Sequence, residues 1–217
     1  MFPFQPCSNI AITGCTGSGK TTFVFKLLKV KTVMFGTDEP ARILYCYGTH
    51  QPMFDEMKEQ IQGIQFHEGL PSKDDIEELA DGRHCMVLLD DLMYEVVSNK
   101  EMESLFVMGS HHRRLTVVYI SQNVFQQGRC ARTLALNSHY LLLFRNMRCG
   151  SQISHLGRDL YPGQRDILIQ AYRDAVCDRP YGYLCIDMSP HLTDERYRLR
   201  TRILPCEGDT WVYVPRK

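Results

Sequence analysis

The chain has 217 residues, of which 44% are hydrophobic and 23% are charged, with 25 basic and 25 acidic side chains. This length and composition exclude a disulfide-rich peptide, a disordered chain and a protein that is positively charged over its whole surface. The charge is unevenly distributed, because residues 1–110 carry a net charge of −7 and residues 111–217 one of +7. We therefore expect a polyanionic partner to bind elements from the second half.

Five short apolar segments predict strands of a parallel sheet. They are rich in Val, Ile, Leu and Tyr and are continuous rather than alternating, which is typical of strands that helices cover on both faces. In chain order the five segments are Asn9 to Ile12, Arg42 to Tyr47, Met86 to Leu89, Thr116 to Ile120 and Tyr140 to Phe144.

Helical patterns occupy the segments between these strands. Apolar residues at helical spacing predict a helix over Lys20 to Lys29. Ser98 to Glu101 has the pattern of a capping box for a helix that ends at Gly109. Two further helices are expected over Gln152 to Leu160 and Gly163 to Val176. The alternation of strands and helices predicts an α/β fold with a mainly parallel central sheet flanked by helices.

The pattern changes after about residue 180, where polar turns but no helices separate the apolar segments. We expect antiparallel strands that are added to one edge of the sheet. No linker rich in Gly or Ser divides the chain, so we predict a single domain over 1–217, with a core at 8–180 and the antiparallel strands within 181–215. These strands are predicted over Tyr181 to Asp187, Arg198 to Leu204 and Trp211 to Val214.

Cysteine spacing and hydropathy indicate the compartment. The nine cysteines are scattered and form no Cys-x-x-Cys pattern, which favours reduced thiols over a disulfide framework or a zinc site. The N-terminus lacks the features of a signal peptide, and no apolar run approaches the roughly 18 residues of a membrane span. We therefore expect a soluble intracellular protein without a membrane partner.

Residues 14–21 have the phosphate-binding pattern Gly-x4-Gly-Lys-Thr. A predicted strand precedes this loop and a predicted helix follows it, which is the context that the motif requires. Its glycines let backbone amides turn toward phosphate oxygens, Lys20 can reach the β- and γ-phosphates, and the Thr21 hydroxyl can bind Mg²⁺. The residues expected to hold the nucleotide are Gly14, Cys15, Thr16, Gly17, Ser18, Gly19, Lys20, Thr21 and Thr22.

Polar residues follow the predicted strands Met86 to Leu89 and Thr116 to Ile120. Asp90 is the expected Mg²⁺ ligand, and Asp91 is expected to accept a proton from the water that attacks the γ-phosphate. Gln122 follows the strand Thr116 to Ile120 and could hydrogen-bond the γ-phosphate or this water. Taken alone, an acidic pair or a polar loop start is also common without such a function. As a series with the phosphate-binding loop, the three residues predict one catalytic site.

Arginines form a further group of candidates. Arg145 and Arg148 follow the strand Tyr140 to Phe144, where one of them could act on a neighbouring subunit's nucleotide or form a surface salt bridge. The segment His111 to Arg114 could face DNA or form a solvated turn. Four arginines at alternate positions would share one face of a strand, as a polyanion track or as charges on an edge strand: Arg196, Arg198, Arg200 and Arg202.

Together, these motifs resemble the packaging ATPases of poxviruses, related large DNA viruses and virus-like transposons, a branch of the FtsK/HerA superfamily. The resemblance runs from about residue 8 to the C-terminus. Besides the loop at 14–21 and the Leu-Leu-Asp-Asp sequence at 88–91, it is carried by Gly109 to Arg113, Tyr119 to Asn123, Leu136 to Tyr140, and Phe144 to Arg148.

The resemblance implies a P-loop NTPase fold of the RecA/FtsK type and a ring-forming motor that hydrolyses ATP with Mg²⁺ to push double-stranded DNA into a preformed capsid. It implies sequence-independent DNA binding, a capsid or portal protein as partner, and action in the host cytoplasm or nucleus where virions assemble. Thr21 and Asp90 would bind the metal, and Arg148 would be the arginine finger. The catalytic residues that it implies are Lys20, Asp90, Asp91, Gln122 and Arg148.

Two other functions stay open at the level of sequence. A small-molecule nucleotide or nucleoside kinase uses the same loop, although no lid segment with arginines is evident. A nucleotide-dependent assembly protein would bind ATP and act as a scaffold without sustained hydrolysis, although the intact pair of Asp90 and Asp91 argues against it.

Overall fold

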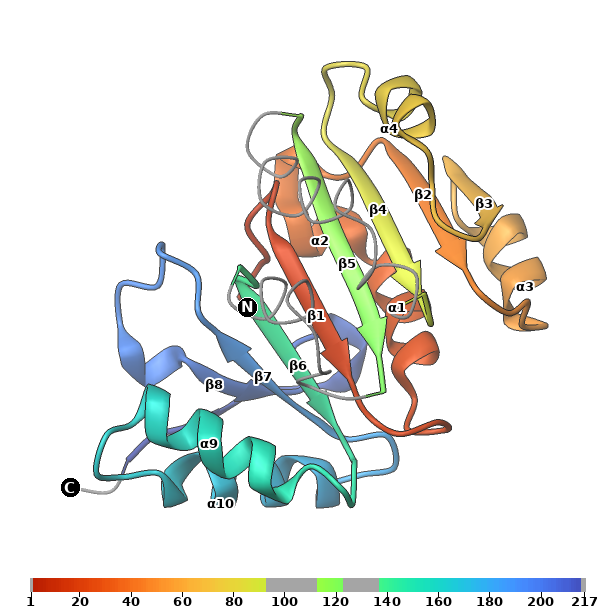
Figure 1. Cartoon of the computed structure of the whole chain (residues 1–217). Helices are drawn as coiled ribbons and strands as arrows, with labels where there is room; N and C mark the ends of the chain where they lie inside the picture. Colours follow the sequence, from red (N-terminus) through yellow and green to blue (C-terminus); the bar gives the residue numbers. More distant parts are fainter. Residues whose placement is uncertain (1, 93–112, 123–136, 216–217) are drawn as a thin grey trace.

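The computed structural model describes residues 2–92, 113–122 and 137–215 (Figure 1). The predicted capping box at 98–101, the helix that follows it to residue 109, and the histidine pair at 111–112 lie outside these described residues.

Six parallel strands form the larger part of one sheet. Most of their residues are buried, which agrees with the continuous apolar runs in the sequence. They are β1 (Asn9–Thr13), β2 (Arg42–Tyr47), β3 (Ile64–Glu68), β4 (Cys85–Asp90), β5 (Leu115–Ser121) and β6 (Tyr140–Phe144).

Three antiparallel strands extend this sheet, namely β7 (Tyr183–Asp187), β8 (Leu199–Thr201) and β9 (Trp211–Tyr213). The strand order is β3-β2-β4-β5-β1-β6-β7-β8-β9. Strand β1 therefore lies inside the sheet, with β5 between it and β4. The predicted α/β class, with a mainly parallel sheet and antiparallel C-terminal strands, is confirmed.

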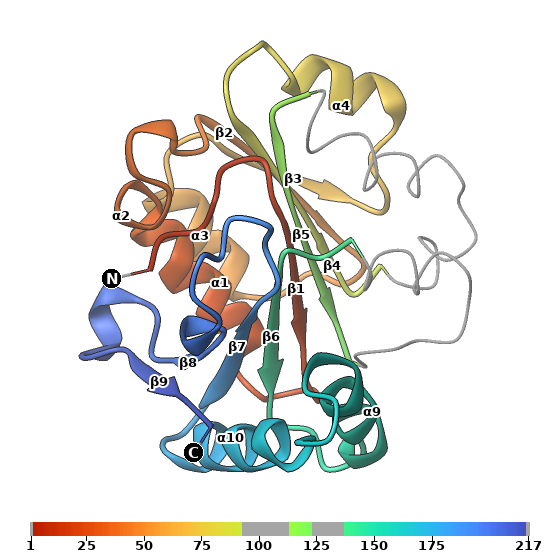
Figure 2. The same cartoon turned by 90° about the vertical axis from the view of Figure 1, so that its left-hand side faces the viewer.

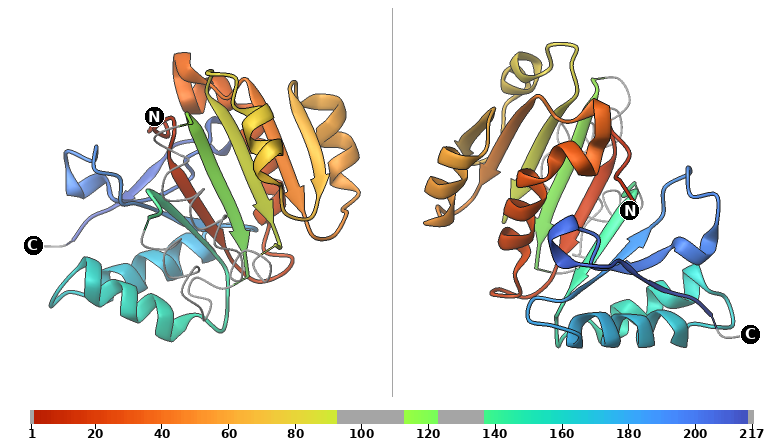
Figure 3. Two further views of the ribbon diagram at one scale, coloured as in Figure 1. Left: turned by 45° about the horizontal axis from the view of Figure 1, so that its top comes forward. Right: turned by 180° about the vertical axis from the view of Figure 1, so that it is seen from behind.

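Helices cover both faces of the sheet (Figure 2 and Figure 3). One face is covered by α1 (Lys20–Lys29), α2 (Lys31–Phe35) and α3 (Met53–Gln60). The other is covered by α4 (Lys73–Leu79), α9 (Gly150–Leu160) and α10 (Asp166–Cys177). Short 3-10 helices are η1 (Gly36–Asp38), η3 (Glu195–Tyr197) and η4 (Pro205–Glu207). Within the described residues, no helix is both long and apolar enough to cross a bilayer.

The strands divide their side chains between two hydrophobic cores. In β1, Ile10 and Ile12 pack into the core under α1, whereas Ala11 packs into the core under α9 and α10. This division follows from the period of two along a strand. A strand buried on both sides needs apolar residues at every position, and burial at this density supplies most of the favourable free energy of folding.

The structure agrees with the predicted bounds of β2, β6 and α1. It also contains four elements that the sequence pattern did not predict, namely β3, α2, α3 and α4. Strand β3 lies at the sheet edge and is only partly buried, so polar residues interrupt its apolar pattern. Helix α4 is short and begins at a capping box, in which the Asp75 amide donates to Ser72 Oγ at 3.2 Å and the Ser72 amide to Asp75 Oδ2 at 2.7 Å.

The prediction that four alternate arginines share one face of a strand is wrong. Strand β8 has only three residues, and Arg196 lies in η3. Each guanidinium group contacts a carboxylate, which leaves no free polyanion track along this segment. The pairs are Arg196 with Asp194, Arg198 with Glu195, Arg200 with Asp187 and Arg202 with Asp178.

Arg200 is the buried member of this group, and its removal should destabilise the fold. Its Nη2 atom lies 2.7 Å from Asp187 Oδ2, and both side chains are more than nine-tenths buried. Arg200→Ala leaves the Asp187 carboxylate buried without its partner, so we expect a loss of about 3–5 kcal/mol in the free energy of unfolding. Urea denaturation measures this loss. The control Arg196→Ala removes an exposed pair and should leave stability unchanged; equal effects of the two variants would contradict the interpretation.

Candidate nucleotide-binding site

The phosphate-binding loop at 14–19 joins β1 to α1. It begins where two backbones approach closely, because a Cβ atom on Gly14 would lie 2.5 Å from Phe144 Cβ. The Gly14 amide donates to the Ser121 carbonyl at 3.3 Å, and the Cys15 amide donates to the Arg145 carbonyl at 3.2 Å. The loop is therefore held between the ends of β5 and β6.

The N-terminus of α1 has no side-chain cap and no acidic residue in its first turn. The first amides of a helix lack partners within the helix and carry partial positive charge. In addition, Ser18 Oγ is buried without a hydrogen-bond partner among the described residues. Donors without partners next to a loop of this kind fit a bound anion such as phosphate.

Lys20 directs its ammonium group back onto the loop. Its Nζ atom donates to the carbonyl oxygens of Gly14 at 2.7 Å and Cys15 at 3.0 Å. Burial lowers the pKa of Lys20, and the nearby Asp90 carboxylate partly opposes this effect. The charge is thus held at the loop by weak acceptors that phosphate oxygens can replace.

Asp90 ends β4 and is buried, with 4% of its surface exposed. Its Oδ2 atom accepts a 2.7 Å hydrogen bond from the Tyr45 hydroxyl, which comes from the neighbouring strand β2. Burial raises the pKa of Asp90, while the Tyr45 hydrogen bond and the Lys20 charge act in the opposite direction. Burial and the adjacent carboxylate raise the pKa of Tyr45 well above its usual value, so the phenol remains a donor.

Asp91 differs from Asp90 in its surroundings. It is exposed, and its backbone has the left-handed φ of 57°. Its side chain has no hydrogen-bond or ion-pair partner among the described residues. A non-glycine residue in this conformation persists only where neighbouring structure holds it; here the Asp91 amide donates to the Ile120 carbonyl at 3.4 Å. One carboxylate of the pair is therefore oriented by Tyr45, and the other can move.

A cavity of about 200 Å³ brings part of the predicted residues together. Of the predicted site residues, six are not among those that line it: Gly14, Cys15, Ser18, Gly19, Thr22 and Arg148. The cavity is lined by Thr16, Gly17, Lys20, Thr21, Gln51, Asp90, Asp91, Ile120, Ser121 and Gln122.

The charges around this cavity favour an anion that is bound together with a cation. Among the described residues that line the cavity, Lys20 is the single cationic side chain, and it faces two carboxylates. A triphosphate alone would be repelled by the net charge of these three groups, whereas a divalent cation would offset it. Within the described ranges, no group of three His, Cys, Asp or Glu residues could hold a metal by itself. Mg²⁺ fits this arrangement, since it binds through one or two carboxylates together with phosphates.

Gln122 is tied to the turn after β6. Its carbonyl oxygen accepts a 2.9 Å hydrogen bond from Asn146 Nδ2, and Asn146 Oδ1 accepts from the Arg148 amide at 3.0 Å. The Tyr172 hydroxyl, on α10, accepts from the Asn146 amide at 2.9 Å. These bonds join the end of β5 to the turn that carries Arg148.

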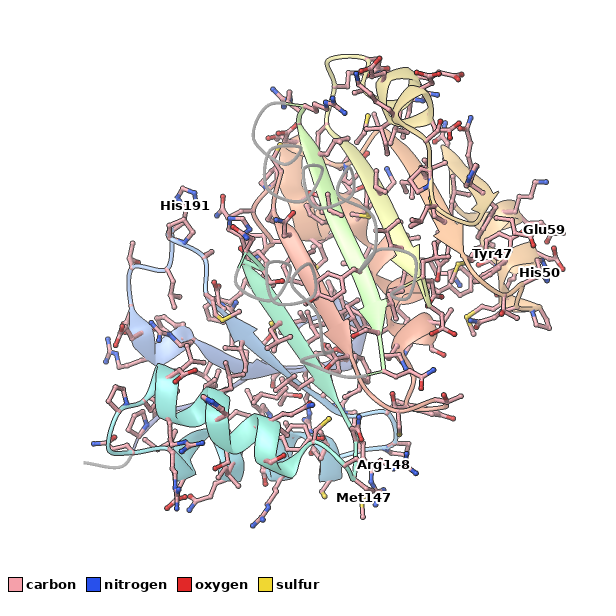
Figure 4. All side chains as sticks on the ribbon, viewed as in Figure 1. Tyr47, His50, Glu59, Met147, Arg148 and His191 are labelled. Atoms are coloured by element: carbon pink, nitrogen blue, oxygen red, sulfur yellow. The ribbon has the colours of Figure 1, made fainter. Side chains whose placement is uncertain are left out.

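Arg148 lies away from the cavity that its own chain forms. Figure 4 shows it next to Met147 at the end of β6, directed away from the body of the molecule. Its side chain is exposed, and neither Arg148 nor Arg145 has a carboxylate partner among the described residues. A surface salt bridge, which was one interpretation of these two arginines, is therefore not formed within the part of the chain that is described.

Sequence reasoning missed three residues at this site, namely Tyr45, Gln51 and Asn146. Gln51 lines the cavity from the loop after β2, and the Gly48 amide in that loop donates to the Asp90 carbonyl at 3.1 Å. The signal for Gln51 was available, because a predicted strand ends four residues before it. Tyr45 gave no signal, since an interior tyrosine of an apolar strand reads as core.

A larger hollow of about 650 Å³ lies between α10 and β9 and contains none of the predicted site residues. Its lining includes Asp166, Gln170, Asp174 and Tyr213, and the Tyr213 hydroxyl donates to Asp174 Oδ2 at 2.7 Å.

Comparisons with known proteins concern the fold. No protein-family model matches the chain, and no curated protein matches it. Among solved structures, the genome packaging NTPase B204 from Sulfolobus turreted icosahedral virus 2, in complex with ATP-γS, matches with a TM-score of 0.56 and 11% identity, over 98% of this chain and 99% of B204. B204, the DNA-packaging ATPase from Sulfolobus turreted icosahedral virus, matches with a TM-score of 0.56 and 10% identity, over 99% of this chain and 100% of that one.

The cytoplasmic domain of EssC also matches, with a TM-score of 0.50 and 17% identity, over 73% of this chain and 36% of that structure. At these identities the likeness is one of fold. The chain has the fold of the viral packaging ATPases over nearly its whole length, and the fold that the sequence resemblance implied is confirmed.

Neutralising Asp90 should stabilise the protein that holds no nucleotide. Because the pKa of Asp90 is raised on folding, ionising this carboxyl costs the folded state free energy, and its contribution to stability falls as pH rises above about 4. Asp90→Asn keeps an acceptor for Tyr45 without the charge. We expect its free energy of unfolding to exceed that of the wild type at pH 7.5, with a smaller excess at pH 4, in urea denaturation. A larger excess at pH 4 would mean that attraction to Lys20 outweighs burial.

Proposed function

We propose that this protein is an ATPase that, as an assembly of several copies, moves double-stranded DNA during the packaging of a viral or virus-like genome. The observation that carries the proposal is the convergence of Lys20, Asp90, Asp91 and Gln122 on one cavity at the carboxyl edge of the parallel sheet. The comparisons support the proposal, because the chain shares its fold with two viral packaging proteins over nearly its whole length.

The residues of the site would divide the work of hydrolysis. The loop amides and Lys20 would bind the phosphates, and the Thr21 hydroxyl and Asp90 would hold Mg²⁺, which neutralises charge on the β- and γ-phosphate oxygens when bound. Tyr45 fixes the orientation of Asp90. Asp91, which has no side-chain partner among the described residues, would accept a proton from the attacking water, and Gln122 would hydrogen-bond that water or the γ-phosphate.

The turn after β6 would couple this site to a neighbouring subunit. Its Arg145 carbonyl accepts from the Cys15 amide, and its Asn146 side chain donates to the Gln122 carbonyl. A shift of the loop or of Gln122 on hydrolysis would therefore move the same turn. Because Arg148 lies on that turn and outside its own cavity, we assign it to the nucleotide of the adjacent copy, as an arginine finger in trans.

DNA would be held through its phosphates and without sequence preference, since a motor must accept every sequence. The arginines of residues 196–202 are paired with carboxylates and would contribute little to this contact. Arg114 is also paired, with Nη2 at 2.8 Å from Asp38 Oδ1. Among the described arginines of the second half, Arg145 and Arg148 at the turn after β6 have no carboxylate partner within the described residues, and neither do Arg158 on α9 and Arg173 on α10.

Long duplex DNA should stimulate ATP hydrolysis several-fold at low salt, because translocation makes turnover depend on the track. Lys20→Ala should lower hydrolysis at least about 100-fold by removing a charge that stabilises the transition state, while thermal unfolding stays unchanged. The measurement is phosphate release with and without DNA. If the turnover of the assembled protein is insensitive to DNA, translocation is contradicted. Phosphate transfer to a nucleoside would indicate a kinase. A single turnover without further hydrolysis would indicate an assembly protein.

Mixing two inactive variants would test whether Arg148 acts in trans. Arg148→Ala alone should lose roughly 10³-fold in rate without loss of ATP binding. In a ring that mixes Arg148→Ala with Lys20→Ala, some intact cavities face a neighbour with an intact arginine. Activity should then return to about a quarter of the wild-type rate for an equal, random mixture.

The control for this experiment is Arg158→Ala, an exposed arginine on α9, which should remain active. If Arg148 acts within its own chain, the mixture of Arg148→Ala and Lys20→Ala stays inactive at every ratio, and the assignment in trans is wrong.

A further inference from the structure

We propose that Tyr181 is the platform on which the base of the bound nucleoside triphosphate stacks. The proposal rests on the proposed function, because it requires the triphosphate to occupy the phosphate-binding loop. It goes further in assigning a residue that recognises the nucleoside part of the substrate rather than its phosphates.

The cavity beside the loop is too small to enclose the nucleoside together with the phosphates. Its volume of about 200 Å³ is below the range of about 300–1,000 Å³ in which pockets enclose whole small-molecule ligands. Its lining residues come from the loop itself, from the ends of β4 and β5 and from the loop after β2. In the sheet these three strands all lie on one side of β1. A triphosphate that enters from this side would extend toward the opposite side, where β6 and β7 lie.

Tyr181 occupies that opposite side. It lies in the turn at 178–182 between α10 and β7, which runs beside the phosphate-binding loop (Figure 1). A Cβ atom on Gly19 would lie 2.7 Å from Tyr181 Cβ and 2.8 Å from Tyr181 Cδ1. The tyrosine therefore lies directly against the last loop residue before α1. Gly19 has a φ of 96°, so glycine serves there both the backbone conformation and the close approach.

The tyrosine ring is available to a ligand. Tyr181 is 63% exposed, which is unusual for a large aromatic residue in contact with a loop. Within the described residues its side chain has no hydrogen-bond, ring-stacking or cation partner. An exposed aromatic face next to a phosphate site is suited to a nucleobase, because every base presents a flat π-surface.

The turn holds Tyr181 in place before any ligand arrives. Tyr181 has a left-handed φ of 62°, a conformation that persists only where neighbouring contacts hold it. The Gly182 amide donates to the Arg179 carbonyl at 3.0 Å, and Asp178 accepts hydrogen bonds from both Arg179 and Arg202. A turn whose backbone is already positioned loses little conformational freedom when a ligand binds to its side chain, which favours affinity.

A purely structural role would be to shield Gly19 from solvent. Substitutions separate the two roles, because any apolar side chain shields the loop but only an aromatic ring stacks. Tyr181→Phe keeps both properties, Tyr181→Leu keeps the apolar cover alone, and Tyr181→Ala removes both.

The experiment compares ATP with inorganic tripolyphosphate, which has the phosphates but no base, by calorimetry in the presence of Mg²⁺. For Tyr181→Leu and Tyr181→Ala we expect ATP affinity to fall about tenfold, the scale of one base-stacking contact. Tripolyphosphate affinity should stay within about twofold of the wild type. Tyr181→Phe should bind both ligands as the wild type does. The control Tyr197→Ala alters an exposed tyrosine that contacts the Phe2 ring and should change neither affinity.

The outcomes distinguish this inference from the proposed function. If the wild type binds both ligands and Tyr181→Ala weakens neither, or weakens both equally, the stacking platform is wrong while the nucleotide site stands. If Tyr181→Leu binds ATP as tightly as the wild type, the role of Tyr181 is to cover the loop, and the inference is again overturned. If the wild type binds neither ligand, the proposed function itself fails.

Discussion

The parallel register of β1, β5 and β4 is the constraint on which the candidate site depends. Thr13 pairs with Ser121, and Asp90 pairs with Ile120. The chain therefore leaves these three strands at nearly the same level, and the phosphate-binding loop, the acidic pair and Gln122 emerge together. Burial on both faces keeps this register in place, because a slip by one residue would move every side chain into the opposite core. The chemistry at the edge thus depends on packing in the interior.

Electrostatics at this edge oppose stability and favour binding. Asp90 is a buried carboxylate whose charge costs free energy, and Lys20 is a partly desolvated ammonium held by carbonyl oxygens. Ligands that offset these costs bind more tightly than they would to a solvated surface. The same site that weakens the free protein would therefore gain stability from a triphosphate and Mg²⁺, a common cost of function in proteins.

How much of the site could be read from the sequence depended on where each residue lies. Lys20, Asp90, Asp91 and Gln122 follow strands with clear apolar patterns, so their meeting at one cavity was predictable. Tyr45 and Asn146 form hydrogen bonds to residues of other strands, which the sequence pattern does not show. Tyr181 contacts Gly19 of the loop, although the two residues are about 160 positions apart in the chain. The prediction that Arg200 shares one strand face with the other alternate arginines was wrong. Alternate spacing predicts a common face only if the strand is long enough, and β8 is too short.

The sequence alone determined the local chemistry: a glycine-rich loop before a helix, apolar strands that end in carboxylates or amides, and a change of pattern near residue 180. These features depend on residues that are close together in the chain, so their spacing can be read from the sequence itself. Only the tertiary structure decided which strands are adjacent, which arginines are paired with carboxylates, and which aromatic ring lies against Gly19. Contacts between distant segments depend on the path of the whole chain, because loop closure and packing, rather than local propensity, bring them together.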